Sequence, residues 1–223
     1  MNFKHGRTFL TLAAISLCSM ARAQVFKWKG ADLGVAGTGQ FTTSITSQTY
    51  AQTGGFLLPH NGTTDSAGAL VTLQEYSVPW LGFEVNYQYS HFSQHYNAGA
   101  NDSNYVQVPN GSHEFTAAYL VRKKTHGVTG HLAVGGGSIY FDSGQAVQTA
   151  IASPLGAPLH TPNQWRATGL FDVGIDMQTK SNLGFRLGAR DLLYRAPNFH
   201  QAYLASSRWV STEEPYAGVY VRF

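Results

Sequence analysis

The chain has 223 residues and a formal net charge of +3, yet only 12% of its residues are charged. That share is about half of the ~25% that is usual in soluble domains, whereas 13% of the residues are aromatic and 24 are glycine. No run of 18 apolar residues follows the first 23 residues, which argues against a transmembrane helix. The composition favours a single domain that exposes one side of each strand to lipid.

The N-terminus has the features of a secretory signal peptide. Lys4 and Arg7 precede a short apolar run, Phe9–Leu17, which is too short to span a membrane. The small-x-small pattern Ala21-Arg22-Ala23 then predicts cleavage before Gln24. We therefore expect a cleaved signal peptide (residues 1–23), a short periplasmic N-terminal segment (24–31) and a barrel domain (32–223).

Loss of this leader changes the charge balance and the cysteine count. It removes three of the 15 basic residues, which leaves 12 to balance 12 acidic residues, so nucleic acid is not an expected partner. Lipidation of Cys18 would require a small residue before it, and that residue is Leu17. Cys18 should therefore be lost with the leader, and no disulfide remains to stabilise the mature chain.

Alternating side chains predict strands along the rest of the chain. Alternation is clear in residues 32–45, 81–90, 114–122, 165–177, 183–190 and 216–223. Two further strands, at about 69–76 and 128–141, alternate poorly and are inferred from their position. In 81–90 every second residue is apolar or aromatic: Leu81, Phe83, Val85, Tyr87 and Tyr89.

The connections between these strands indicate which solvent they face. Long links at 46–67, 91–111, 142–161 and 195–213 alternate with short links at 77–79, 124–127 and 178–182. Outer-membrane barrels have an even strand number, long extracellular loops and short periplasmic turns. The sequence predicts an all-β fold: an eight-stranded antiparallel transmembrane up-and-down β-barrel with four long extracellular loops and three short periplasmic turns.

Aromatic residues near the predicted strand ends suit the two membrane interfaces, where amphipathic rings gather. These residues are Trp80, Tyr89, Tyr140, Trp165, Tyr194 and Tyr216. A soluble lipocalin-like barrel is the alternative. It is disfavoured because the opposite parity carries Glu, Asp and Arg, which an apolar core would not bury without partners.

The C-terminal segment Tyr216–Phe223 alternates and ends in an aromatic residue, and in this it resembles the outer-membrane assembly signal. Residues 31–223, including Phe185–Tyr194, resemble small bacterial outer-membrane barrels of the OmpA/OmpX type. The resemblance implies an outer-membrane location, contact with membrane lipid and lipopolysaccharide, and recognition by the barrel-assembly machinery. The residues assigned to this signal are Tyr216, Gly218, Tyr220 and Phe223.

Charged residues of inward parity form the candidate site: Glu84, Glu114, Arg122, Asp172, Asp176, Arg186, Arg190 and Arg222. Pairing through the last turn is expected to set Asp176 opposite Gly184 and Asp172 opposite Gly188, with Arg186 diagonally between the carboxylates. Glu84 is expected at a similar height across the lumen. Eight strands leave an interior that side chains fill, so a plug of ion pairs is favoured over a gate.

Three classes of function follow from these observations. The favoured one is a non-catalytic surface barrel, either structural in the envelope or binding an extracellular ligand through its loops. The second is a small gated channel with a narrow conductance. The third, a lipid A-modifying barrel enzyme, rests on His91-Phe92-Ser93, a short His-x-Ser pattern. We expect a monomer without cofactor, and no metal site, although His91, His95 and His113 lie around the predicted second loop and strand pairing would bring His91 and His113 close together.

Overall fold

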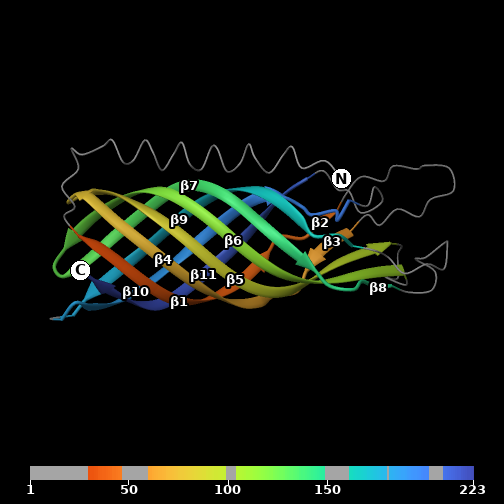
Figure 1. Cartoon of the computed structure of the whole chain (residues 1–223), viewed down its shortest axis with the longest axis horizontal. Coiled ribbons are helices and arrows are strands. Elements are labelled where there is room, and N and C mark those ends of the chain that lie inside the picture. The colour runs from red at the N-terminus through yellow and green to blue at the C-terminus, as the bar shows by residue number, and fades with distance from the viewer. Residues whose placement is uncertain (1–29, 47–59, 99–103, 149–160, 180, 201–207) are drawn as a thin grey trace.

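The structure, a computed structural model, describes residues 30–46, 60–98, 104–148, 161–179, 181–200 and 208–223 (Figure 1). In this part of the chain eight long strands form one closed antiparallel barrel, as predicted. They are β1 (Ala31–Thr42), β4 (Ser66–Val78), β5 (Leu81–Ala98), β6 (Asn104–Thr125), β7 (Val128–Ser143), β9 (Gln164–Gln178), β10 (Leu183–Arg195) and β11 (Trp209–Arg222). No helix among the described residues is long and apolar enough to cross a membrane.

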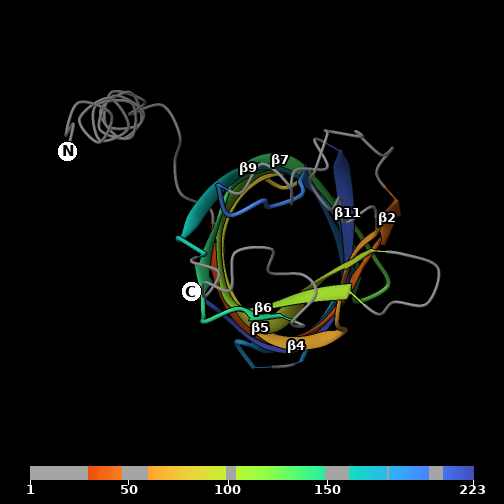
Figure 2. The ribbon, with the colours of Figure 1, turned by 90° about the vertical axis from the view of Figure 1, so that its right-hand side faces the viewer.

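Each long strand pairs with its neighbours in the sequence, and the first strand pairs with the last. β1 and β11 close the ring in a register that sets Asp32 opposite Arg222. The amides of Ala31 and Phe223 each donate to the other residue's carbonyl over 3.0 Å, which fastens the seam at its end. Figure 2 shows the resulting closed ring, an up-and-down barrel without a free edge.

Short turns join the strands at one end of the barrel. β4 and β5 are paired up to Val78 and Leu81, and β6 and β7 up to Thr125 and Val128. In the second of these turns His126 and Gly127 both have positive φ, 49° and 86°, as a two-residue type I′ turn requires. The third turn is held by the amide of Thr179, which donates to the carbonyl of Leu183 over 3.1 Å. We call this end the turn end and the opposite end the loop end.

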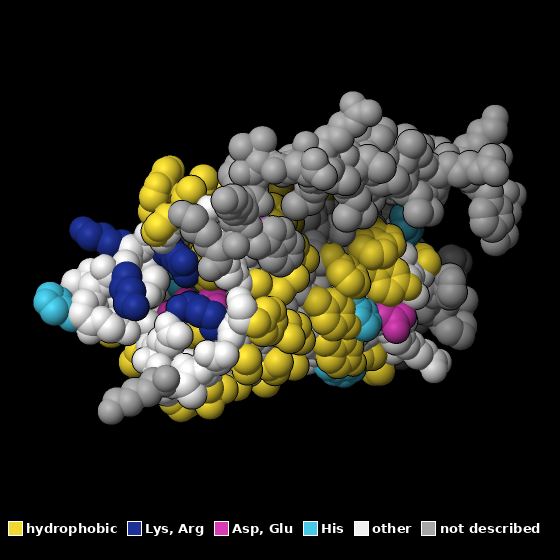
Figure 3. Space-filling view, turned by 60° about the vertical axis from the view of Figure 1, so that its left-hand side comes forward, with side chains coloured by type: hydrophobic (Ala, Val, Ile, Leu, Met, Phe, Trp, Pro, Cys, Tyr) yellow, Lys and Arg dark blue, Asp and Glu magenta, His cyan; other side chains and the backbone are white. Residues whose placement is uncertain are grey.

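The outer surface of the barrel is apolar. Val35, Val134 and Phe171 are typical of this belt, with about half of each side chain exposed (54%, 53% and 45%). Figure 3 shows hydrophobic side chains over the middle of the face in view and Lys and Arg side chains gathered at the turn end. Exposed apolar side chains in such number are stable against lipid and would be unfavourable in water.

The prediction that residues 91–111 form a loop is wrong for most of this range. β5 and β6 continue through it and remain paired as far as Ala98 and Asn104. The same positions stay buried beyond Ser90, but their chemistry changes from polar to mainly apolar. Phe92 and Tyr96 are buried there, and His91 is exposed. Strands that leave lipid for water need a polar outer face and an apolar inner face, so their sequence no longer resembles that of a transmembrane strand.

Other loop boundaries also differ. The predicted first loop contains β3 (His60–Thr63) and reaches β2 (Ile45–Thr46), and the predicted third loop contains β8 (Val147–Gln148). β11 begins at Trp209, inside the predicted fourth loop. Two aromatic residues assigned to the interfaces, Tyr194 and Tyr216, instead point into the barrel and are 4% and 5% exposed. Their hydroxyls have polar partners in the interior, which explains why burial is favourable.

Candidate functional site

A network of charged side chains fills the lumen from the turn end to its middle. Near the turn end its centre is Arg186 on β10. The Nε and Nη2 atoms of Arg186 donate to the two carboxylate oxygens of Asp176 over 2.7 and 3.0 Å, and Nη2 also donates to Gln74 over 2.5 Å. Arg186 and Asp176 are 4% and 2% exposed, so this bidentate pair is shielded from water.

The predicted pairing between β9 and β10 is wrong by two residues. Asp176 lies opposite Arg186, and Asp172 lies opposite Arg190, while Gly184 faces Gln178. The reason is the turn, which closes between Thr179 and Leu183 and therefore shifts the register relative to the expected one. Each arginine consequently lies directly across from a carboxylate instead of diagonally between two of them.

A second arginine, Arg190, lies one level further toward the loop end. Its Nη2 donates to Glu114, and its Nη1 donates to Gln88 over 3.0 Å. Carboxylate oxygens of Glu214 and Asp172 lie 3.6 and 3.9 Å from its nitrogen atoms. Carboxylates therefore outnumber guanidinium groups at this level, and neutral amides supply part of the hydrogen bonding: Gln88 donates to Glu214 over 2.7 Å.

His131 on β7 links the two levels. Its Nε2 lies 3.1 Å from the Tyr216 hydroxyl, which donates to Asp172 over 2.9 Å. The ring nitrogens of His131 also lie 3.6 Å from Asp172 and 3.7 Å from Asp176. Glu84, on β5, accepts hydrogen bonds from Gln74 over 3.1 Å and from Asn86 over 2.9 Å. Carboxylates at different heights in the lumen thus share one set of polar contacts.

Glycines on β10 make room for the tyrosines of β11. Gly184 faces Tyr220 and Gly188 faces Tyr216 across the strand pair. A Cβ atom at Gly188 would lie 2.5 Å from the Tyr216 ring, and one at Gly184 would lie 2.3 Å from the Tyr220 ring. The alternation of glycine and arginine along β10 therefore seats both the tyrosine rings and the guanidinium groups in a narrow interior.

Two of the sequence-predicted site residues lie at the turn-end rim, apart from the central cluster. Arg222 donates from Nε and Nη2 to Asp32 over 2.7 and 2.8 Å, and its side chain is 27% exposed. Arg122 donates to the carbonyl of Pro79, and its guanidinium lies 3.2 Å from the centre of the Tyr76 ring. The remaining six predicted residues are buried: Glu84, Glu114, Asp172, Asp176, Arg186 and Arg190.

Sequence reasoning missed several buried members of the network. Asp32 and Glu214 are both fully buried, and His131 is 5% exposed. Asp32 has the same parity as Gln40, which donates to Glu214 over 2.5 Å, and Glu214 has the parity of Tyr216. Asp32 already lies on the inward parity of the predicted strand 32–45, and extending the last strand by two residues would have added Glu214. His131 lies in a strand with weak alternation and gives no such signal.

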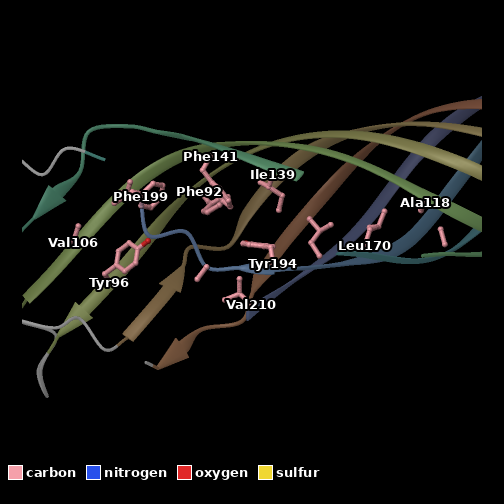
Figure 4. Packing of buried hydrophobic residues seen from close by; sticks show 14 of the residues in the cluster. Phe92, Tyr96, Val106, Ala118, Ile139, Phe141, Leu170, Tyr194, Phe199 and Val210 are labelled. Carbon is pink, nitrogen blue, oxygen red and sulfur yellow. The ribbon is translucent and has the colours of Figure 1, made fainter. Parts of the chain in front are cut away.

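At the loop end, beyond the charged network, the lumen is filled by apolar and aromatic side chains that belong to the buried hydrophobic cluster (Figure 4). Residues 196–200 fold into it after β10, so that Phe199 is fully buried. The amide of Phe199 donates to Gln164 over 3.1 Å, and the Tyr96 hydroxyl donates to the carbonyl of Pro197 over 2.8 Å. Burial raises the pKa of the Tyr96 hydroxyl, which keeps it protonated as a donor. We call Phe92, Tyr96, Phe141, Tyr194 and Phe199 the mouth cluster.

The described residues offer little that would support chemistry. No group of three or more His, Cys, Asp and Glu side chains in them is placed to hold a metal ion. His91 and Ser93 share one face of β5, and the Ser93 amide donates to the Thr64 hydroxyl over 3.0 Å. His113 contacts the Tyr87 hydroxyl over 3.0 Å on the outer surface, among aromatic rings. Charged side chains and apolar side chains instead occupy successive levels of the lumen.

These features define the fold of a small outer-membrane β-barrel. The outer-membrane protein OprG from Pseudomonas aeruginosa superposes with a TM-score of 0.50 at 9% identity, covering 88% of this chain and 97% of that one. Ail of Yersinia pestis, an attachment invasion locus protein, gives a TM-score of 0.46 at 9% identity over 87% and 98% of the two chains. Neisserial surface protein A gives 0.42 at 12% identity over 86% and 97%. Neither a protein-family model nor a curated protein sequence matches the chain.

Proposed function

We propose that this protein is a non-catalytic surface barrel of the bacterial outer membrane whose lumen is closed. The observation that carries this proposal is the filled interior. The charged network closes the lumen from the turn end to the middle, and the mouth cluster closes it at the loop end. An eight-stranded barrel has an interior just wide enough for side chains, so two packed layers leave no continuous aqueous path.

We propose further that the turn end faces the periplasm and the loop end the outside. Short periplasmic turns and longer extracellular connections are the rule in barrels of this kind. In this orientation the leader, residues 1–23, is removed on export and Gln24 becomes the first residue. N-terminal sequencing of protein from isolated outer membranes tests this step, and an intact leader would contradict it.

The loop end supports a role in surface binding or in envelope structure. β5 and β6 project beyond the apolar belt, and β3 pairs with β5 while β8 pairs with β6 in this region. Their inward residues are buried, so the projection is packed instead of being a bare hairpin. Its outer face exposes polar and titratable side chains such as His91. Such a rigid platform would present an extracellular ligand with a defined surface.

Conductance of planar bilayers tests the closed lumen. The refolded mature protein should insert without producing current steps, whereas an open porin inserted under the same conditions gives steps and serves as the positive control. Insertion should be verified separately by protease protection of the same bilayer preparation. Regular steps from wild-type protein would contradict the proposal and would favour the gated channel with a narrow conductance.

A further inference from the structure

The outer surface near the turn end carries an apolar groove of about 520 Å³ over β6, β7 and β9. Two rows of paired residues form it. Toward the membrane centre, Val121, Leu132 and Val173 lie side by side, and the next row is Lys123, Gly130 and Ile175. A Cβ atom built on Gly130 would meet no atom within 4 Å, so the missing side chain is what opens the groove. Trp80, 61% exposed, completes its lining.

The rim of the groove is basic. Lys123 stands beside Gly130 in the register and is exposed on the outer face, whereas Lys124 pairs with the buried Thr129 and has the opposite, inward parity. Lys123 has no salt-bridge partner among the residues that the structure describes. The carboxylates of β9 at this level, Asp172 and Asp176, point into the lumen and are paired there, as the burial of both shows. The Lys123 ammonium group therefore lies on the outer face of the barrel without a neutralising acid from β9.

We propose that this groove binds an anionic phospholipid, with one acyl chain over Gly130 and Leu132 and the phosphate at Lys123. Charge and shape both favour this occupant: the floor is apolar and the rim is cationic at the level where a headgroup would lie. Trp80 has an amphipathic ring of the kind that is enriched at this depth. The inference rests on the proposed outer-membrane orientation, which places the groove in the periplasmic leaflet, where phospholipid is available.

Quenching of Trp80 by brominated lipid tests the proposal. Replacing Trp28, Trp165 and Trp209 by Phe leaves Trp80 as the only tryptophan of the full chain. The protein is refolded into phosphatidylcholine vesicles with 20% phosphatidylglycerol, with bromine on the chains of one lipid or the other. Brominated phosphatidylglycerol should quench Trp80 more than its share of the lipid predicts, with a relative affinity of about five-fold for the one lysine at the groove. Equal quenching per molecule by the two lipids would overturn the proposal.

Two variants separate the headgroup from the groove. Lys123→Gln should bring the relative affinity close to one, and retention of the preference would show that Lys123 is not the phosphate site. Gly130→Val should fill the groove and lower quenching by brominated phosphatidylglycerol. Gly37→Val is the matched control, because a Cβ atom there also meets nothing within 4 Å but lies on β1, away from the groove. An equal effect of both glycine variants would also overturn the proposal.

This measurement is independent of the proposed closed lumen. The quenching experiment depends neither on the orientation of the barrel in the vesicle nor on a surface ligand. Absence of a lipid preference would therefore leave the surface-barrel proposal intact. Conductance steps from wild-type protein would overturn the closed lumen and leave the lipid preference unaffected.

Discussion

At the scale of single residues, the interior depends on arginines that carboxylates surround. Arg186 donates to Asp176 and Gln74 in a space that excludes water. Removal of Arg186 leaves Asp176 buried without its guanidinium partner. Asp32 also loses one of its two neighbouring guanidinium groups, because its Oδ2 lies 3.9 Å from Arg186 Nη2. The loss in stability from removing one charged residue therefore depends on which buried charges are left without a partner.

Arg186→Ala should destabilise the refolded barrel by about 3–5 kcal/mol, the usual consequence of breaking one side of a buried pair. Leu187→Val is the control: Leu187 is 42% exposed on the lipid face, and the change keeps an apolar side chain there. Urea unfolding in detergent micelles, followed by tryptophan fluorescence, compares the two variants. Equal stability of Arg186→Ala and wild type would mean that water reaches residue 186 and that the lumen is open.

At the level of Arg190, removing the arginine should lower the stability of the barrel more than removing one of the carboxylates does. Arg190 faces Glu114, Glu214 and Asp172, so carboxylates are in excess there. Arg190→Met should cost more than about 3 kcal/mol, whereas Glu214→Gln should change stability by less than about 1 kcal/mol, because it removes an excess carboxylate. The same urea titration measures both variants. A larger loss for Glu214→Gln than for Arg190→Met would show that the charge excess is compensated in another way.

At the scale of elements, the sequence predicted the eight strands and their order, because lipid on one side imposes a strict two-residue period. That period also located Asp172 and Arg186 on the inner face. It failed where its physical cause ends: beyond Ser90 water replaces lipid and the pattern inverts in β5. It also left the β9–β10 register open, since the shift depends on how Thr179 and Leu183 close the turn.

The close contact between β10 and β11 predicts that a larger side chain at Gly188 destabilises the barrel. Gly188→Ala places a methyl group 2.5 Å from the Tyr216 ring and 2.6 Å from the Val173 carbonyl, so the strands or the ring must shift. Overpacking of this kind typically costs about 1–3 kcal/mol. Gly37→Ala adds the same methyl group where nothing lies within 4 Å and should be nearly neutral. Thermal unfolding in micelles compares them, and equal melting temperatures would contradict the tight Gly188–Tyr216 contact.

The end of β11 should matter more for assembly than for stability. The Phe223 side chain is 66% exposed, while its backbone holds the seam with Ala31. Phe223→Ala keeps that backbone and removes the ring, so the refolded protein should unfold in urea much as wild type does. In cells the amount of inserted protein should fall, as the resemblance to the assembly signal implies. Normal insertion of Phe223→Ala would show that the terminal aromatic ring is not recognised.

At the scale of the whole molecule, the proposed closure of the lumen rests on two layers of different chemistry in series. Near the turn end a permeating ion would meet the buried charged network, and near the loop end it would meet the mouth cluster. Phe199 comes from residues 196–200, which follow the last residue of β10, so the chain itself supplies a side chain that fills the lumen there. At the mouth cluster, the cost of removing water from an ion would oppose its passage. In the charged network, side chains that fill the narrow lumen would oppose it.

Barriers in series predict a specific pattern of conductance. Phe199→Ala should shorten the mouth cluster but leave the charged network closed, and Arg186→Ala should loosen the network but leave the mouth closed. Each single variant should therefore conduct little, and the double variant should give clear steps in planar bilayers. Circular dichroism of each reconstituted sample controls for folding. Full conductance from Phe199→Ala alone would mean that the charged layer is permeable to ions and that only the mouth cluster closes the barrel.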